Sequence, residues 1–211
     1  MPLLDVSITD ARRCFDANYF GVLATIQTFS PLLIAAAKGR IINISSVAQF
    51  SPVPFLGVYN SSKAALSLLS STLRIELSPF GIAVINVITG GVSTNIFDNQ
   101  IIERLPERSV YDVGNSKSEI ENVMAGSVAR RFQSPVEDVA RKVVREALSR
   151  WPRSNLCVGS QSSVMWAAST FLWVGFLVSS KAGNRVRKVT DLGIGLAVFV
   201  PVRIMGGEEK S

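Results

Sequence analysis

Two side chains in the stretch VYNSSKAAL, residues 58–66, have the spacing and the chemistry of a proton-transfer pair. Tyr59 and Lys63 are four residues apart at the start of an apolar-periodic segment, so a helix places them on the same face. A free phenol has a pKa of about 10, and a nearby ammonium group favours its ionised form. By itself the pair allows two interpretations: a surface lysine lying on an aromatic ring, or a phenol whose acidity the lysine raises.

The segments that must position this pair alternate between helical and extended patterns. Apolar periodicity predicts helices over 9–37, 57–78 and 134–148, and short β-branched runs predict buried strands over 39–45, 82–88 and 155–159. Strands that alternate with helices and are buried on both faces indicate a parallel α/β sheet.

The expected ends of two helices rest on capping residues. Thr9 is the expected N-cap of the first helix, and Pro31 is expected to kink that helix about one turn before it ends. For the helix near residue 135, Ser134 is the expected N-cap, Pro135 fits the first helical position, and Glu137 completes a capping box.

Polar residues follow the carboxyl ends of two predicted strands. Ser45 and Ser46 end the first strand, and the loop TGGVST, residues 89–94, leaves the second. Ligands of open parallel sheets bind beyond the carboxyl ends of the strands, so we expect these residues and the start of the Tyr59 helix at one rim. The polar connection over 98–133 is long enough to predict a mobile lid over that site.

The composition excludes several other kinds of site. The 211 residues contain no histidine, which excludes histidine metal sites and Ser-His-Asp triads, and we expect no metal. Cys14 and Cys157 lie far apart in apolar contexts and are expected to be small buried hydrophobes in a reducing compartment. The net charge of +6 includes no run of five or six basic residues, so nucleic-acid binding is not expected.

Four motifs, in this order, resemble the short-chain dehydrogenase/reductase family: NYFG (18–21), GRIINISS (39–46), YNSSK (59–63) and TGGVST (89–94). Ser46 precedes Tyr59 by the spacing of that family's substrate-binding serine, whereas Thr89 stands where most members have proline. Within that family, the sequence most resembles the 1-acyldihydroxyacetone-phosphate reductase branch. The resemblance implies that residues 1–160 form the C-terminal half of a Rossmann-like, doubly wound parallel sheet that carries the catalytic motifs.

The resemblance also implies a role for each candidate residue. Tyr59 would protonate a carbonyl oxygen while hydride arrives from a nicotinamide, and Lys63 would lower the pKa of Tyr59 and hold the nicotinamide ribose. Ser46 would donate a hydrogen bond to the same oxygen, and Asn18 would hold a water in a proton relay behind Lys63. The implied cofactor-binding residues are Tyr59, Lys63, Gly90, Val92 and Thr94. In isolation, Asn18 could be a polar helix residue, Ser46 a turn residue and Thr94 a local cap.

The activity implied by the resemblance is NADPH-dependent reduction of a lipid-like carbonyl substrate such as 1-acyldihydroxyacetone phosphate. Relatives also pair through the helices that correspond to 9–37 and 57–78, so a homo-oligomer is expected. An alternative is a catalytically silent, truncated paralogue that binds a membrane or another subunit.

The Gly-rich phosphate turn of the family precedes the region matched here. The nearest string in this sequence, GIG at 193–195, lacks the third glycine. We therefore expect the cofactor-binding half to be absent, because the chain is a fragment or mis-started gene model, a genuine short form, or a form repurposed without cofactor. The strand RIINIS would then be an apolar edge strand.

Residues 161–211 form an apolar and basic C-terminal extension. The run VMWAASTFLWVGFLV, 164–178, is too short to cross a hydrocarbon core of about 30 Å, and four basic residues and a second apolar run follow it. This pattern predicts a helix lying on an anionic membrane, here the cytosolic face of the endoplasmic reticulum or a lipid droplet. The alternative is a pair of core or dimer-interface elements in a cytoplasmic protein.

Overall fold

The computed structural model describes residues 1–50, 53–95, 104–112, 116–126, 130 and 132–171. Within them, three parallel strands form one sheet in the order β1 (Gly39–Ser46), β2 (Ile82–Thr89) and β3 (Asn155–Val158). The parallel α/β sheet is confirmed, and each predicted strand end is correct to within one residue. In the described part of the chain β1 pairs only with β2, and Ile44 on β1 is 50% exposed.

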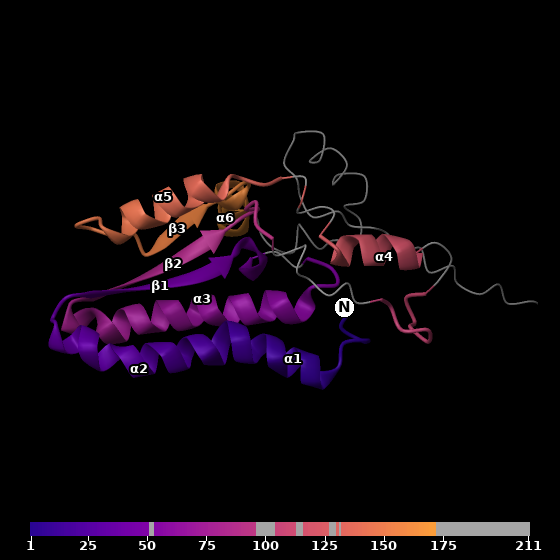
Figure 1. Cartoon of the computed structure of the whole chain (residues 1–211), viewed down its shortest axis with the longest axis horizontal. Coiled ribbons are helices and arrows are strands. Elements are labelled where there is room, and N and C mark those ends of the chain that lie inside the picture. Colours follow the sequence, from indigo (N-terminus) through magenta and orange to yellow (C-terminus); the bar gives the residue numbers. More distant parts are fainter. Residues whose placement is uncertain (51–52, 96–103, 113–115, 127–129, 131, 172–211) are drawn as a thin grey trace, which may run out of the picture.

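Helices cover both faces of this sheet (Figure 1). The helices α2 (Gly21–Ala35) and α3 (Gly57–Leu77) lie on one face, and α5 (Val136–Ala147) lies on the other. Alternate residues of β2 serve the two faces, as the pleat of a strand requires. One core cluster contains Ile26, Ile41, Leu73, Ile82 and Val84, and the other contains Ile85, Val87, Leu156 and Val158, against which Val139 and Val143 of α5 pack.

The first helical segment differs from the expected continuous helix. It consists of α1 (Ile8–Phe15), a π-helical turn over Asp16–Phe20, and α2. The predicted N-cap Thr9 is wrong, because the Ser7 hydroxyl accepts the N–H of Asp10 at 3.0 Å and the helix begins one residue before Thr9. Pro31 lies within α2, four residues before the end of that helix.

The predicted capping box of α5 is also wrong. Ser134 pairs through its backbone instead, donating to Gly91 O at 3.0 Å and accepting from Ser93 N at 2.9 Å. This pairing keeps the chain extended through Pro135, which occupies the N-cap position without a side-chain cap, so α5 begins at Val136.

The connection over 98–133 contains a helix that the sequence pattern did not predict. This helix, α4 (Ser116–Met124), buries Ile120 and Met124 against Leu105, and Met1, Phe55 and Tyr111 pack on the same cluster. The Ser109 hydroxyl donates to Asp5 Oδ2 at 2.7 Å, which ties this region to the amino-terminal loop. The mobility expected of a lid stays a prediction.

The last described helix, α6 (Ser162–Phe171), covers the start of the predicted apolar run 164–178. The rest of that run, the basic cluster and the second apolar run lie outside the described residues. Among the helices that the structure describes, none has the length and apolarity needed to cross a bilayer.

Candidate active site

The carboxyl ends of β1 and β2 meet at one rim of the sheet. The strand register places Ser46 opposite Thr89, and the Thr89 hydroxyl donates to Ser45 O at 2.6 Å across the two strands. Thr89, which stands in place of the family's proline, therefore links the two strand ends. After β1, a 3₁₀ turn over Val47–Gln49 and a loop lead to α3, which starts at Gly57.

Ser46, Tyr59 and Lys63 come together at this rim. The Ser46 side chain lies close enough to the Tyr59 phenol to lower its pKa, and the Ser46 hydroxyl accepts the N–H of Ala48 at 3.2 Å. The Lys63 ammonium lies 5.8 Å from the centre of the Tyr59 ring and donates to Ile44 O at 3.0 Å. The four-residue helical spacing thus places both side chains on the face of α3 that meets the end of β1.

The electrostatics of Tyr59 are opposite in sign to the expectation. Burial raises the pKa of Tyr59 above its ordinary value, the Ser46 side chain partly opposes this, and the charge of Cys14 adds to the rise. Burial also lowers the pKa of Lys63. The expected lowering of the Tyr59 pKa by Lys63 is therefore wrong for this structure, because desolvation disfavours the charged forms of both groups. Burial therefore makes the Tyr59 phenol a weaker acid than a free tyrosine.

Asn18 reaches α3 through a residue that the sequence pattern did not single out. Its amide, in the π-helical turn, donates to the Ser62 hydroxyl at 3.0 Å and to the Cys14 sulfur at 3.5 Å. Ser62 is fully buried and donates to Tyr59 O at 2.8 Å. Asn18 thus braces the backbone of Tyr59, and its expected role in holding a water stays a prediction. The signal for Ser62 was a small polar residue at a core-facing position of α3.

The loop after β2 is held by contacts within the chain. A Cβ placed on Gly90 would lie 1.8 Å from Ser160 O, so packing against the end of β3 already requires glycine here. Val92 forms a bridge with Ser134, and Thr94 lies in an exposed bend two residues further on. The cofactor contacts expected of Gly90, Val92 and Thr94 stay predictions.

The residues at the rim fit one end of a nicotinamide dinucleotide. The Lys63 ammonium has three donors, and the structure shows one of them given to Ile44 O. The Tyr59 hydroxyl and Lys63 are thus suited to ribose hydroxyls. The expected absence of the Gly-rich turn that binds a pyrophosphate stays a prediction.

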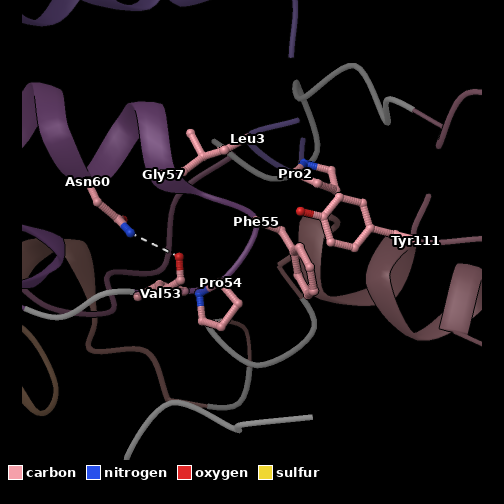
Figure 2. A pocket seen from close by; sticks show the side chains of 8 residues that line it. All are labelled: Pro2, Leu3, Val53, Pro54, Phe55, Gly57, Asn60 and Tyr111. Atoms are coloured by element: carbon pink, nitrogen blue, oxygen red, sulfur yellow. Dashed lines mark hydrogen bonds between the residues drawn. The ribbon is translucent and has the colours of Figure 1, made fainter. Parts of the chain in front are cut away.

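An apolar pocket of about 270 Å³ lies beside the start of α3 (Figure 2). The Phe55 and Tyr111 rings meet there edge to face at 6.4 Å, and the Asn60 amide donates to Val53 O at 2.9 Å. The lining residues are Pro2, Leu3, Val53, Pro54, Phe55, Gly57, Asn60 and Tyr111. Two of them, Gly57 and Asn60, flank Tyr59 in the sequence.

The sequence is similar to those of known proteins. A family profile described as short chain dehydrogenase matches residues 1–104. The chain is 45% identical over 150 residues to short-chain dehydrogenase ptmH of Penicillium ochrochloron, an alignment that covers 71% of this chain and 53% of that protein. The chain belongs to the short-chain dehydrogenase/reductase family. Another member, the NADPH-dependent 1-acyldihydroxyacetone phosphate reductase of Schizosaccharomyces pombe, is 41% identical over 114 residues, which are 52% of this chain and 38% of that protein.

Solved short-chain dehydrogenase structures share the fold. One from Streptomyces avermitilis superposes with a TM-score of 0.67 at 21% identity, over 92% of this chain and 66% of that chain. A family member from Burkholderia phymatum, in complex with NAD, superposes with a TM-score of 0.64 at 24% identity, over 80% of this chain and 59% of that chain. The chain spans about half the length of the family relatives that it matches in sequence.

Proposed function

We propose that residues 1–160 carry the proton-transfer half of an NADPH-dependent carbonyl reductase of the short-chain dehydrogenase type. The observation that carries this proposal is the grouping of Ser46, Tyr59 and Lys63 at the carboxyl ends of β1 and β2, with the Ser46 side chain beside the phenol. The C-terminal half of a doubly wound sheet, with a separate extension over 161–211, is the organisation that we propose for this chain.

In the proposed reaction, Tyr59 gives its proton to the carbonyl oxygen of the substrate. Ser46 donates a hydrogen bond to the same oxygen and fixes it where negative charge develops. Lys63 would hold the ribose of a bound cofactor, and the nicotinamide of that cofactor would supply the hydride for the carbonyl carbon. Asn18 and Ser62 position Tyr59 through its backbone carbonyl. A phenol of ordinary pKa about 10 carries its proton at neutral pH and can donate it to the carbonyl oxygen.

The substrate that we propose is a lipid-like ketone such as 1-acyldihydroxyacetone phosphate. Two observations support it: the apolar pocket beside the start of α3, and the identity to the Schizosaccharomyces pombe reductase. NADPH is the proposed cofactor because of the identity to the Schizosaccharomyces pombe reductase.

The test of this activity supplies a phosphate-binding unit, so a chimera should place a Gly-rich βαβ unit of the short-chain dehydrogenase type ahead of residue 1. The chimera should oxidise NADPH with 1-acyldihydroxyacetone phosphate and much more slowly with dihydroxyacetone phosphate, the matched substrate without an acyl chain. A well-folded chimera that oxidises NADPH with neither ketone would contradict the proposed reaction.

We further propose that residues 161–211 hold the protein on the cytosolic face of the endoplasmic reticulum or on lipid droplets. The support is the pattern of two apolar runs around a basic cluster. Cell fractionation should find the full chain with these membranes and a chain ending at residue 160 depleted from them. Equal distributions would exclude a role for 161–211 in targeting.

The proposed homo-oligomer uses the outer faces of α2 and α3. Leu32, Leu68 and Ile75 on these helices are 66%, 71% and 77% exposed. Sedimentation velocity should show a smaller species when Leu68 and Ile75 are both changed to glutamate, and an unchanged distribution would refute this interface.

A further inference from the structure

The carboxyl-terminal end of α5 presents apolar side chains to solvent. Val144, Leu148 and Trp151 are 55%, 78% and 80% exposed. Val144 and Leu148 are four residues apart, so they lie on one face of the helix, while Val139 and Val143 pack into the core on the other. An indole at this exposure, next to an exposed leucine, is a concentration of apolar surface that folding of the described chain leaves uncovered.

The same region is strongly cationic. Between residues 141 and 153 the basic side chains are all exposed, and they are Arg141, Lys142, Arg145, Arg150 and Arg153. The one acidic residue in this range, Glu146, is 8% exposed, and its carboxylate accepts the N–H of Arg153 at 2.7 Å and lies 3.8 Å from the guanidinium of Arg153. Among the other bases, Arg141 pairs with Asp138 at 3.2 Å and the Arg150 guanidinium lies 5.7 Å from the centre of the Trp151 ring. The range 141–153 therefore exposes no carboxylate.

We infer that this α5 surface, residues 141–153, docks on the headgroup layer of an anionic bilayer. Indole rings favour the boundary between headgroups and acyl chains, aliphatic side chains enter it, and exposed bases are attracted to anionic lipids. A symmetric contact with a second copy would bring the same bases together, which like-charge repulsion opposes. The surface lies on a different segment from 161–211, and its binding does not require catalysis.

Trp151 itself can report on this contact. The chain has three tryptophans, so full-length protein with Trp166→Phe and Trp173→Phe leaves Trp151 as the single emitter. The probes are vesicles of phosphatidylcholine with phosphatidylserine, and vesicles of phosphatidylcholine alone. With the anionic vesicles, Trp151 emission should shift to the blue, become shielded from iodide, and be quenched by brominated acyl chains.

A matched pair of charge reversals separates local from overall charge. The test variant carries Lys142→Glu and Arg145→Glu on the α5 surface. The control variant carries Arg12→Glu and Lys38→Glu, which change exposed bases elsewhere. Both variants lower the net charge of +6 by the same amount. The first pair should weaken partition of the Trp151 signal into anionic vesicles at least about tenfold relative to the second.

Three results would overturn the inference. The first is equal iodide access to Trp151 with and without anionic vesicles. The second is equal loss of binding in both charge-reversal pairs. The third is shielding of Trp151 that rises with protein concentration without vesicles, which would assign the surface to a second copy.

Discussion

Removal of the Ser62 hydroxyl tests whether Ser62 links Asn18 to the backbone of Tyr59 on α3. Ser62 is fully buried, accepts a hydrogen bond from the Asn18 amide at 3.0 Å and donates to Tyr59 O at 2.8 Å. Alanine at this position removes the acceptor of the partly buried Asn18 amide. An unsatisfied buried polar group costs about 1–3 kcal/mol. Because Asn18 keeps its contact with the Cys14 sulfur, we expect about 1–2 kcal/mol for Ser62→Ala.

The neighbouring serine provides the control. Ser61 is exposed, and its hydroxyl donates only to Gly57 O at 2.9 Å, one turn back in the same helix. Ser61→Ala should leave stability unchanged or raise it by a few tenths of a kcal/mol, since alanine is the better helix former. Urea unfolding followed by circular dichroism measures both midpoints. Equal midpoints for the two variants would refute the bracing role of Ser62.

A double-mutant cycle locates the partner of Ser62. If the Asn18 amide is the group left unsatisfied, Asn18→Ala and Ser62→Ala should be non-additive by at least about 0.5 kcal/mol. Additive losses would mean that Ser62 does not act through the Asn18 amide.

Three further outcomes follow from the described contacts. Gly90→Ala should lower the free energy of unfolding in urea by roughly 1–3 kcal/mol, because the added Cβ would lie 1.8 Å from the Ser160 backbone. Gly39→Ala is the control, since its Cβ would meet only the movable Leu33 side chain at 2.9 Å. Equal losses of stability in the two variants would contradict the packing role of Gly90. Because burial raises the pKa of Tyr59, the phenol deprotonates first in the unfolded chain as the pH rises above ~10. The free energy of unfolding should therefore fall more steeply above this pH in the parent protein than in Tyr59→Phe. Parallel curves of unfolding free energy against pH would refute this. The expected absence of a Gly-rich turn for the pyrophosphate predicts that the 211-residue chain binds NADPH only weakly in calorimetry. Micromolar affinity would contradict that expectation.

The periodic elements were predictable from the sequence. Short apolar runs predicted all three strands, and in the first the run is β-branched and bounded by glycine and serine, because strands buried on both faces leave a continuous apolar pattern. The shared face of Tyr59 and Lys63 followed from their four-residue helical spacing. The meeting of Ser46 with this pair followed from its place at the carboxyl end of a parallel strand.

The errors fall where long-range contacts decide the outcome. Ser134 has the chemistry of an N-cap, but its backbone is already paired with Gly91 and Ser93, which are distant in sequence. The helix α4 has a weak apolar pattern, and the residues that bury it, Met1, Phe55 and Tyr111, come from elsewhere in the chain. The pKa of Tyr59 is raised by burial, and the four-residue spacing of Tyr59 and Lys63 does not predict how buried these side chains are.

The central claim is that Tyr59 is the proton donor, and Tyr59→Phe in the chimera tests it most directly. The phenyl ring keeps the shape and loses only the hydroxyl, so NADPH binding should stay nearly unchanged. The turnover rate should fall by about 10²–10⁴-fold, the range for loss of a general acid. A variant that retains more than about a tenth of the rate would assign less than ~1.4 kcal/mol of barrier to the hydroxyl and would contradict the role of Tyr59.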